Sequence, residues 1–214
     1  SGGGQWTYNG GSNKPHANIG RVNCIAFHPT DPNTLWVGAP SGGLWETTNH
    51  GASWTTTTDQ LPHIGVSDVA INPQNPNIMY LASGHADGFV PSPHTPAMHV
   101  LKSTDGGLTW SPTVSNWSST PQPLIRRLLI DPVNPQVIIA ATSSGIHRSS
   151  DGGGTWTTTL TNEWFVDLEF KPGNSNVVYA STKSMPPSKI FTSTDNGVTW
   201  SLVATLNNGV RTEL

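Results

Sequence analysis

Residues 193–200, Ser-Thr-Asp-Asn-Gly-Val-Thr-Trp, decide the fold, because closely related octapeptides occur three more times in the chain. The other copies are residues 47–54 (TTNHGASW), 103–110 (STDGGLTW) and 149–156 (SSDGGGTW). Each copy ends in tryptophan, and the steps between successive tryptophans are 56, 46 and 44 positions. A repeat of about 40–50 residues is typical of a four-stranded propeller blade.

A second signature recurs in phase with the octapeptide. Its copies are residues 28–33 (HPTDPN), 72–77 (NPQNPN), 131–136 (DPVNPQ) and 171–176 (KPGNSN). Proline with Asn or Asp at these offsets favours a tight turn between two strands. The flanking segments, for example residues 128–130 and 137–141, are unbroken apolar runs, which indicate strands covered on both faces.

Each unit therefore predicts strand A, a Pro-Asn turn, strand B, a loop, strand C, the octapeptide turn and strand D. In the third unit we expect these strands at residues 124–130, 137–142, 145–149 and 155–160. Stacked blades would cover both faces of the inner strands. We predict an all-β fold, a β-propeller of four-stranded antiparallel blades that is part of a larger ring.

The predicted organisation treats residues 1–214 as one partial propeller. We expect the blades at residues 20–58, 65–113, 124–160 and 165–204. Residues 1–19 are expected to supply a closing strand and its lead-in, and residues 209–214 to begin a further blade.

The octapeptide residues have structural roles in this interpretation. The Asp carboxylate can accept backbone N–H groups of its own turn, and the Gly two positions later permits a positive φ. The Trp ring buries a large area against the blade. Asn49 replaces Asp in the first copy, and its remaining acceptor oxygen should preserve the turn. The residues assigned to this structural set are Asn49, Trp54, Asp105, Trp110, Asp151, Trp156, Asp195 and Trp200.

Composition excludes several classes of partner. Charged residues make up 11% of the chain, the formal net charge is −3, and basic residues are scattered. This gives no electrostatic basis for nucleic-acid binding, and no apolar stretch approaches the length of a membrane span. The one cysteine, Cys24, cannot form an intrachain disulfide, and we expect a buried, inert thiol.

The octapeptides resemble the BNR/Asp-box repeats of sialidases, xyloglucanase-like glycoside hydrolases, sortilin-type domains and photosystem assembly factors. Residues 20–33 (GRVNCIAFHPTDPN) and 37–45 (VGAPSGGLW) resemble propellers of large secreted Bacteroidetes proteins, which often use type IX export. This resemblance implies a secreted or cell-surface protein, with other domains of a longer chain among its partners. It also implies that ligands bind where the D–A and B–C loops share one face of the propeller.

Three features of that face are candidates for function, the third being Arg126 with Arg127. An insertion at residues 84–99 carries His85, Asp87, His94 and His99, which could ligate a divalent metal. Their spacing matches no named motif, so we expect a Pro-stiffened loop with solvated His, without metal or cofactor. Trp117 and Trp164 lie in successive D–A loops, where they could form an aromatic platform for a sugar or peptide. The equally weighted alternative is that both rings pack under their own loops.

Arg126 and Arg127 begin a strand A, and strand alternation places them on opposite faces of the sheet. One of them could line the central channel. The plainer interpretation is a structural ion pair with Asp167 or Glu169.

The sequence assigns no catalytic residue. Glycoside hydrolysis needs two carboxyl groups about 5–10 Å apart. Where xyloglucanase-like enzymes place a catalytic Asp before Gly-Gly, this chain has Pro40, and the Arg-Ile-Pro motif of sialidases is absent. Only Asp59, Asp87 and Glu163 remain as loop carboxylates. We therefore expect a non-catalytic propeller that binds glycan or protein. The alternative is a divergent glycoside hydrolase with part of its active site outside this segment.

Overall fold

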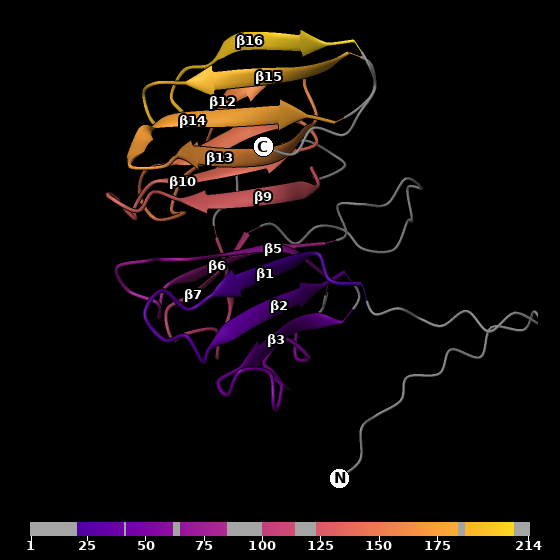
Figure 1. Ribbon diagram of the computed structural model, residues 1–214, viewed down its shortest axis with the longest axis vertical. Helices are drawn as coiled ribbons and strands as arrows, with labels where there is room; N and C mark the ends of the chain where they lie inside the picture. Colours follow the sequence, from indigo (N-terminus) through magenta and orange to yellow (C-terminus); the bar gives the residue numbers. More distant parts are fainter. Residues whose placement is uncertain are drawn as a thin grey trace, which may run out of the picture.

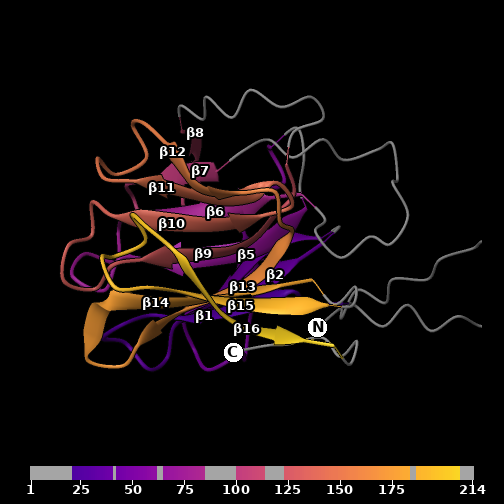
Figure 2. The same ribbon diagram turned by 90° about the horizontal axis from the view of Figure 1, so that it is seen from above.

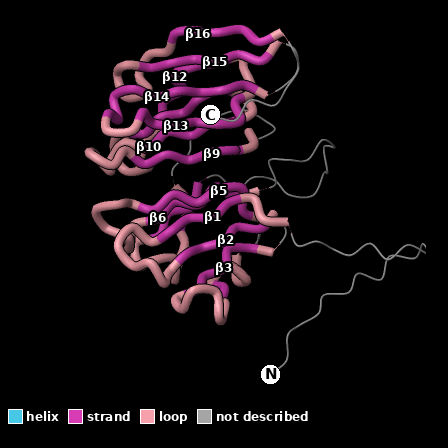
Figure 3. The backbone as a smooth tube through the Cα atoms, viewed as in Figure 1, coloured by secondary structure: helices cyan, strands magenta, loops and turns pink. Residues whose placement is uncertain are grey.

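The structure is a computed structural model that describes residues 21–40, 42–61, 65–84, 100–113, 123–183 and 187–207. The described residues form sixteen strands and no helix (Figures 1 and 3). They contain nothing helical that could span a membrane. The fold is all-β, as the sequence predicts.

The strands form four sheets of four strands each. The first blade contains β1 (Cys24–Phe27), β2 (Leu35–Ala39), β3 (Gly43–Thr47) and β4 (Thr55–Thr56). The second contains β5 (Val66–Ile71), β6 (Met79–Ser83), β7 (Val100–Ser103) and β8 (Ser111–Pro112). The third contains β9 (Ile125–Ile130), β10 (Ile138–Thr142), β11 (Gly145–Ser149) and β12 (Thr157–Thr161). The fourth contains β13 (Phe165–Lys171), β14 (Asn174–Thr182), β15 (Ser188–Ser193) and β16 (Ser201–Leu206).

Within every sheet each strand pairs antiparallel with the next strand along the chain. Figure 2 shows this succession most clearly in the third blade, from β9 through β10 and β11 to β12. The strands of that blade start and end within two residues of the predicted positions, and β11 has the predicted bounds. The predicted four-stranded antiparallel blade is confirmed.

The blades pack in series through their A strands, with β5 against β1, β9 against β5 and β13 against β9 (Figure 1). Three separate apolar clusters fill the three interfaces. The first joins blades one and two around Trp36 and Leu81, and the second joins blades two and three around Tyr80 and Ile138. The third joins blades three and four around Ile139. The hydrophobic core of the described residues therefore lies between sheets, which explains why strand B, for example β10 with Ile138 and Ile139, is apolar on both faces.

Close packing between the first two blades requires a glycine in β2. A Cβ atom at Gly38 would lie 2.5 Å from the Sγ of Cys24 and 2.7 Å from the Cγ1 of Val66. Burial first, and the neighbouring Asp68 second, raise the pKa of the Cys24 thiol to about 12. The thiol therefore stays protonated at neutral pH, although Cys24 is half-buried where the sequence predicts a buried residue.

The octapeptide turns occupy equivalent places in the four blades. Each closing tryptophan immediately precedes the fourth strand of its sheet, at Trp54, Trp110, Trp156 and Trp200. In every copy a backbone N–H of the octapeptide also donates to a carbonyl of the A–B turn in its own blade, for example from Gly152 to Gln136 at 2.9 Å. The octapeptide turn is thus hydrogen-bonded to the A–B turn of the same blade.

Hydrogen bonds inside the third octapeptide explain its sequence. The Oδ1 of Asp151 accepts the backbone N–H of Thr155 at 2.8 Å, and its Oδ2 accepts the Thr155 hydroxyl at 2.7 Å. The hydroxyl of Ser149 donates to Oδ1 and accepts the N–H of Gly153 at 2.9 Å. Gly152 and Gly153 have φ values of 68° and 86°, a conformation that a side chain resists.

The first octapeptide forms the same turn, although it has the neutral Asn49 in place of Asp. The Oδ1 of Asn49 accepts the N–H of Ser53 at 2.9 Å, and the Gly51 N–H reaches the Thr47 hydroxyl at 2.9 Å. The amide nitrogen of Asn49 now donates to the Ser53 hydroxyl, so the direction of this one bond is reversed. The prediction that Asn preserves the turn is confirmed.

Replacing Asp151 by Ala should lower the free energy of unfolding by about 1–2 kcal/mol, because several hydrogen bonds of the turn lose their acceptor. Asp151→Asn should cost less, since Asn49 shows that an amide can hold the same turn. Chemical denaturation of both variants measures the difference. Ser150→Ala is the matched control, because this neighbouring side chain is exposed in the same turn. An Asp151→Ala protein as stable as wild type would contradict the structural role.

The same variants have an expected pH dependence. The backbone N–H and hydroxyl of Thr155, followed by the Ser149 hydroxyl, lower the pKa of Asp151 to about 2. A carboxyl group with a lower pKa in the folded state stabilises the fold above about pH 4 and loses this effect as the pH falls toward 2. The stability gap between wild type and Asp151→Asn should therefore narrow between about pH 5 and about pH 2.

Candidate functional site

The two edges of each blade differ in character. Antiparallel strands place the B–C and D–A loops at one edge, here called the loop edge, and the A–B and octapeptide turns at the other, the turn edge. The expected ligand face is the loop edge. Of the residues predicted to bind ligand, Trp164 alone lies within the described residues; His85, Asp87, His94, His99 and Trp117 lie outside them.

Trp164 lies in the loop between β12 and β13 and is half-buried. Its carbonyl accepts the backbone N–H of Lys183 at 2.8 Å, and the Lys183 Nζ lies 3.9 Å from the centroid of the indole ring. This distance is typical of a cation–π contact. One face of the ring is therefore taken by an ammonium group, and a ligand would have to use the opposite face or the ring edge.

Glu163, one of the loop carboxylates, forms an ion pair with Lys189 at the start of β15. The backbone N–H of Lys189 donates to the Thr182 hydroxyl at 2.8 Å, which fixes the start of that strand. Glu163 and Trp164 are thus both fastened to the loop region between β14 and β15. Together with Lys183 and Lys189 they form a compact polar group at the loop edge of the fourth blade.

Pro40 directly follows β2 at the loop edge of the first blade, where the resemblance to xyloglucanases would place a catalytic Asp. A Cβ at Gly65 would come within 2.6 Å of the Pro40 carbonyl oxygen, so the backbones of blades one and two touch here. The carbonyl of Gly42, two positions after Pro40, accepts the indole N–H of Trp45 at 2.7 Å. This corner is closed by backbone contacts and offers no carboxylate at position 40.

Metal-binding chemistry has no support within the described ranges. They hold no group of three or more His, Cys, Asp or Glu side chains placed to bind a metal ion. The prediction concerning residues 84–99 stays a prediction, because residues 85–99 lie outside those ranges.

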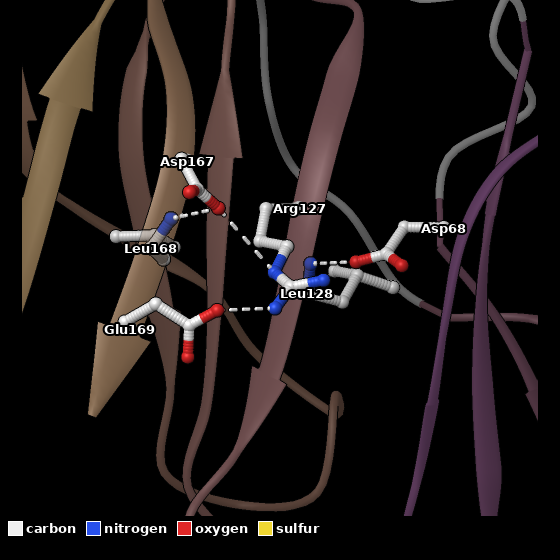
Figure 4. Close-up of polar contacts among 6 residues, drawn as sticks. All are labelled: Asp68, Arg127, Leu128, Asp167, Leu168 and Glu169. Atoms are coloured by element: carbon white, nitrogen blue, oxygen red, sulfur yellow. Dashed lines mark hydrogen bonds and ion pairs between the residues drawn. The ribbon is translucent and has the colours of Figure 1, made fainter. Parts of the chain in front are cut away.

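Arg127 on β9 connects three blades through charge (Figure 4). Its Nη2 lies 2.5 Å from the Oε1 of Glu169, and its Nε lies 3.5 Å from the Oδ1 of Asp167, both on β13. Asp68 of β5 lies on the other side of Arg127 in Figure 4. The Asp68 Oδ2 accepts the backbone N–H of Leu128 at 2.7 Å. The expectation of a structural ion pair with Asp167 or Glu169 is confirmed for both partners.

Asp68 is a buried carboxyl group, only 4% exposed. Burial raises its pKa to about 6, while the positive charge of Arg127 and the Leu128 N–H act in the opposite direction. The nearby Arg127 guanidinium has a raised pKa, because the attraction of Asp68, Glu169 and Asp167 outweighs its own burial. Charge compensation across blade boundaries therefore maintains this network, and no described feature of it points to catalysis.

Sequence reasoning missed Asp68, although the repeat contains a signal for it. Counting four residues back from each A–B turn gives Cys24, Asp68, Arg127 and Asp167. Equivalent positions of neighbouring A strands thus alternate in charge along the last three blades. Nothing in the sequence pointed to Lys183 and Lys189 either, because neither belongs to a motif. Only the folded loops bring them close to Trp164 and Glu163.

Comparison with known proteins supports the repeat assignment. A model of the BNR/Asp-box repeat matches residues 101–112 and 191–202, which contain the C–D turns of the second and fourth blades. Xyloglucanase of Hypocrea jecorina is 28% identical over 221 residues, an alignment that covers 89% of this chain. The chain spans about a quarter of the length of this curated relative, 25%.

Solved structures show the same architecture. The GH74 enzyme of Niastella koreensis is 25% identical, with a TM-score of 0.67 over 88% of this chain and 30% of that one. An ancestral GH74 enzyme superposes with a TM-score of 0.71 at 20% identity, covering 86% of this chain and 25% of that chain. The chain therefore carries BNR/Asp-box repeats in a β-propeller architecture. The expectation of type IX export remains a prediction.

Replacing Arg127 by Met should lower the free energy of unfolding by about 2 kcal/mol at pH 8, because it leaves Asp68 buried without its cation. The loss should be smaller at pH 5, where more of the Asp68 carboxyl is protonated. Because the pKa of Asp68 is raised in the folded state, its ionisation makes the protein less stable as the pH rises from about 4 through 6. Denaturation curves at both pH values test this.

Asp68→Asn supplies the matched control. The amide oxygen can still accept the Leu128 N–H, but the group no longer ionises. The pH dependence of the Arg127→Met effect should then shrink, and the double variant should be more stable at pH 8 than Arg127→Met alone. Strictly additive effects of the two substitutions would contradict the coupling.

Proposed function

We propose that this chain contributes to a secreted β-propeller of the glycoside hydrolase class whose loop edge binds a polysaccharide of the xyloglucan type. The observation that carries this proposal is the similarity to a xyloglucanase along 89% of the chain. A solved GH74 enzyme of the same architecture supports it. Because the chain matches about a quarter of the relative, hydrolysis is proposed for the propeller to which it contributes.

In this proposal Trp164 is the residue that stacks on the polysaccharide. It lies at the loop edge, it is half-buried, and Lys183 fixes its plane by covering one face. A half-buried indole can stack on the apolar face of a sugar ring with the part of its surface that Lys183 does not cover. Glu163 and Lys189 lie beside it as polar groups that could bond sugar hydroxyls.

A second candidate is a non-catalytic glycan-binding propeller. Two observations favour it. Pro40 replaces the catalytic Asp of xyloglucanase-like enzymes, and Glu163 is already neutralised by Lys189. Glycoside hydrolysis needs two carboxyl groups on either side of the scissile bond, whereas Glu163 is held by a lysine. In this candidate the same loop edge binds glycan but hydrolyses nothing.

Binding of a fluorescent xyloglucan oligosaccharide to the chain tests the shared part of both candidates. Trp164→Ala should weaken binding about tenfold, equivalent to ~1.4 kcal/mol. Trp54→Ala is the matched control, because that ring lies at the turn edge and is 39% exposed. Equal binding by wild type and Trp164→Ala would remove Trp164 from the site, and the absence of binding to xyloglucan, cellulose and mannan oligosaccharides would contradict both candidates.

Release of reducing sugar from xyloglucan separates the two candidates. Hydrolysis by the longer protein that contains this chain supports the glycoside hydrolase. If Glu163 takes part, Glu163→Gln should abolish hydrolysis while oligosaccharide binding persists. Binding without any release of reducing sugar would instead establish the non-catalytic candidate.

A further inference from the structure

A polar pocket of about 360 Å³ opens at the turn edge between the third and fourth blades. Its walls come from the A–B turns of both blades, from β11 and from the fourth octapeptide. It lies at the opposite edge of the blades from Trp164, so it is separate from the site proposed above. Its volume falls in the lower part of the range for small-molecule sites.

The preceding interface shows why this pocket exists. Between blades two and three the Nε2 of Gln74 donates to the carbonyls of Pro132 and Val133 at 2.9 and 3.1 Å. The Tyr80 hydroxyl also donates across this interface, to the Gly152 carbonyl at 2.9 Å. Side chains thus bridge the equivalent space.

Both bridging residues are replaced in the next repeat. Val133 stands two positions after the first turn residue, where Gln74 stands in the second blade, and it is 76% exposed. Ile139 stands where β6 has Tyr80, and it packs beneath Gly197, within 2.7 Å of the place a Cβ would occupy there. Neither side chain can form the polar bridge that Gln74 and Tyr80 form. Arg148 and Asp131 still bond Asn196 of the fourth blade, and a pocket remains beside Val133.

The side chains that line the pocket favour an anionic ligand with several hydroxyl groups. The Nε of Arg148 donates to the Asn196 carbonyl at 2.8 Å, which fixes the guanidinium and leaves its terminal nitrogens without a described protein partner. Such a fork is suited to a carboxylate. The amide groups of Asn134 and Asn174 also line the pocket and can bond hydroxyl groups.

Asp131, the carboxylate that lines the pocket, is bonded to groups other than the Arg148 guanidinium. Asp131 is 2% exposed and accepts the Asn196 side-chain amide and the Val133 N–H, the latter at 2.8 Å. Although burial alone would raise its pKa, these donors together with Ser175 lower it. Because the amide nitrogen of Asn196 faces Asp131, its Oδ1 points elsewhere and is buried without a donor among the described residues.

We propose that this pocket binds a single hexuronic acid unit, with the carboxylate on Arg148 and the hydroxyl groups on the surrounding Asn side chains. Val133 would contact an apolar face of the sugar ring. The proposal does not depend on the function of the loop edge.

Calorimetric titration of the chain with D-glucuronic acid, D-glucose and acetate tests it. We expect glucuronic acid to bind with a Kd on the order of 1 mM, and the other two compounds at least about fivefold more weakly. Equal binding of glucose would contradict recognition of the carboxylate. Equal binding of acetate would contradict recognition of the sugar, and no binding of glucuronic acid would overturn the proposal outright.

Two variants localise the binding. Arg148→Lys copies the Lys102 of the preceding interface, whose Nζ bonds the Gly152 carbonyl at 2.9 Å, and should weaken glucuronic acid about fivefold by removing the fork. Val133→Gln should bridge to the next turn as Gln74 does, fill the pocket and abolish binding while the melting temperature is kept. The control Lys102→Arg should leave binding unchanged. Wild-type affinity in a folded Arg148→Lys or Val133→Gln variant would place the ligand elsewhere.

Discussion

A blade of this chain depends on its neighbours, because its second strand carries apolar side chains on both faces of the sheet. The three apolar clusters all lie between sheets, and residues such as Ile138 and Ile139 of one strand face two different clusters. Burial of apolar area is the dominant favourable term in folding, so each sheet is stabilised chiefly by the next one. The outer faces of β1 and β16 expose Ile25, Phe27 and Val203 by the same logic.

Polar contacts fix the position of each blade relative to its neighbours. Arg127 joins the A strands of three blades, where hydrophobic contact alone would tolerate sliding. At the turn edge, Lys102 and Arg148 each donate to the octapeptide carbonyl of the following blade. The octapeptide is therefore both an internal lock for its own blade and an acceptor for the previous one. The backbone has two successive positive φ values in all four copies, and in the third and fourth copies the first of these residues supplies the accepting carbonyl.

The two candidate binding sites lie where the sequences of the repeats differ. At the loop edge of the fourth blade, Lys183 covers the ring of Trp164 and Lys189 pairs with Glu163. At the turn edge, two substitutions between consecutive repeats leave a pocket where the preceding interface has a bridge. Pro40 is a third such difference. The binding and hydrolytic candidates for function depend on these departures, since the shared repeat supplies only the scaffold.

The sequence by itself determined the blades, because the octapeptide and the Pro-Asn turn are local structures whose hydrogen bonds close within a few residues. It also placed Trp164 in a loop and allowed Arg127 to pair with Asp167 or Glu169. Only the tertiary structure decided that Lys183 covers Trp164, that Asp68 shares the charge of Arg127, and that a pocket opens beside Val133. These contacts join residues about 20–60 positions apart, and their geometry depends on how blades pack, which no local pattern encodes.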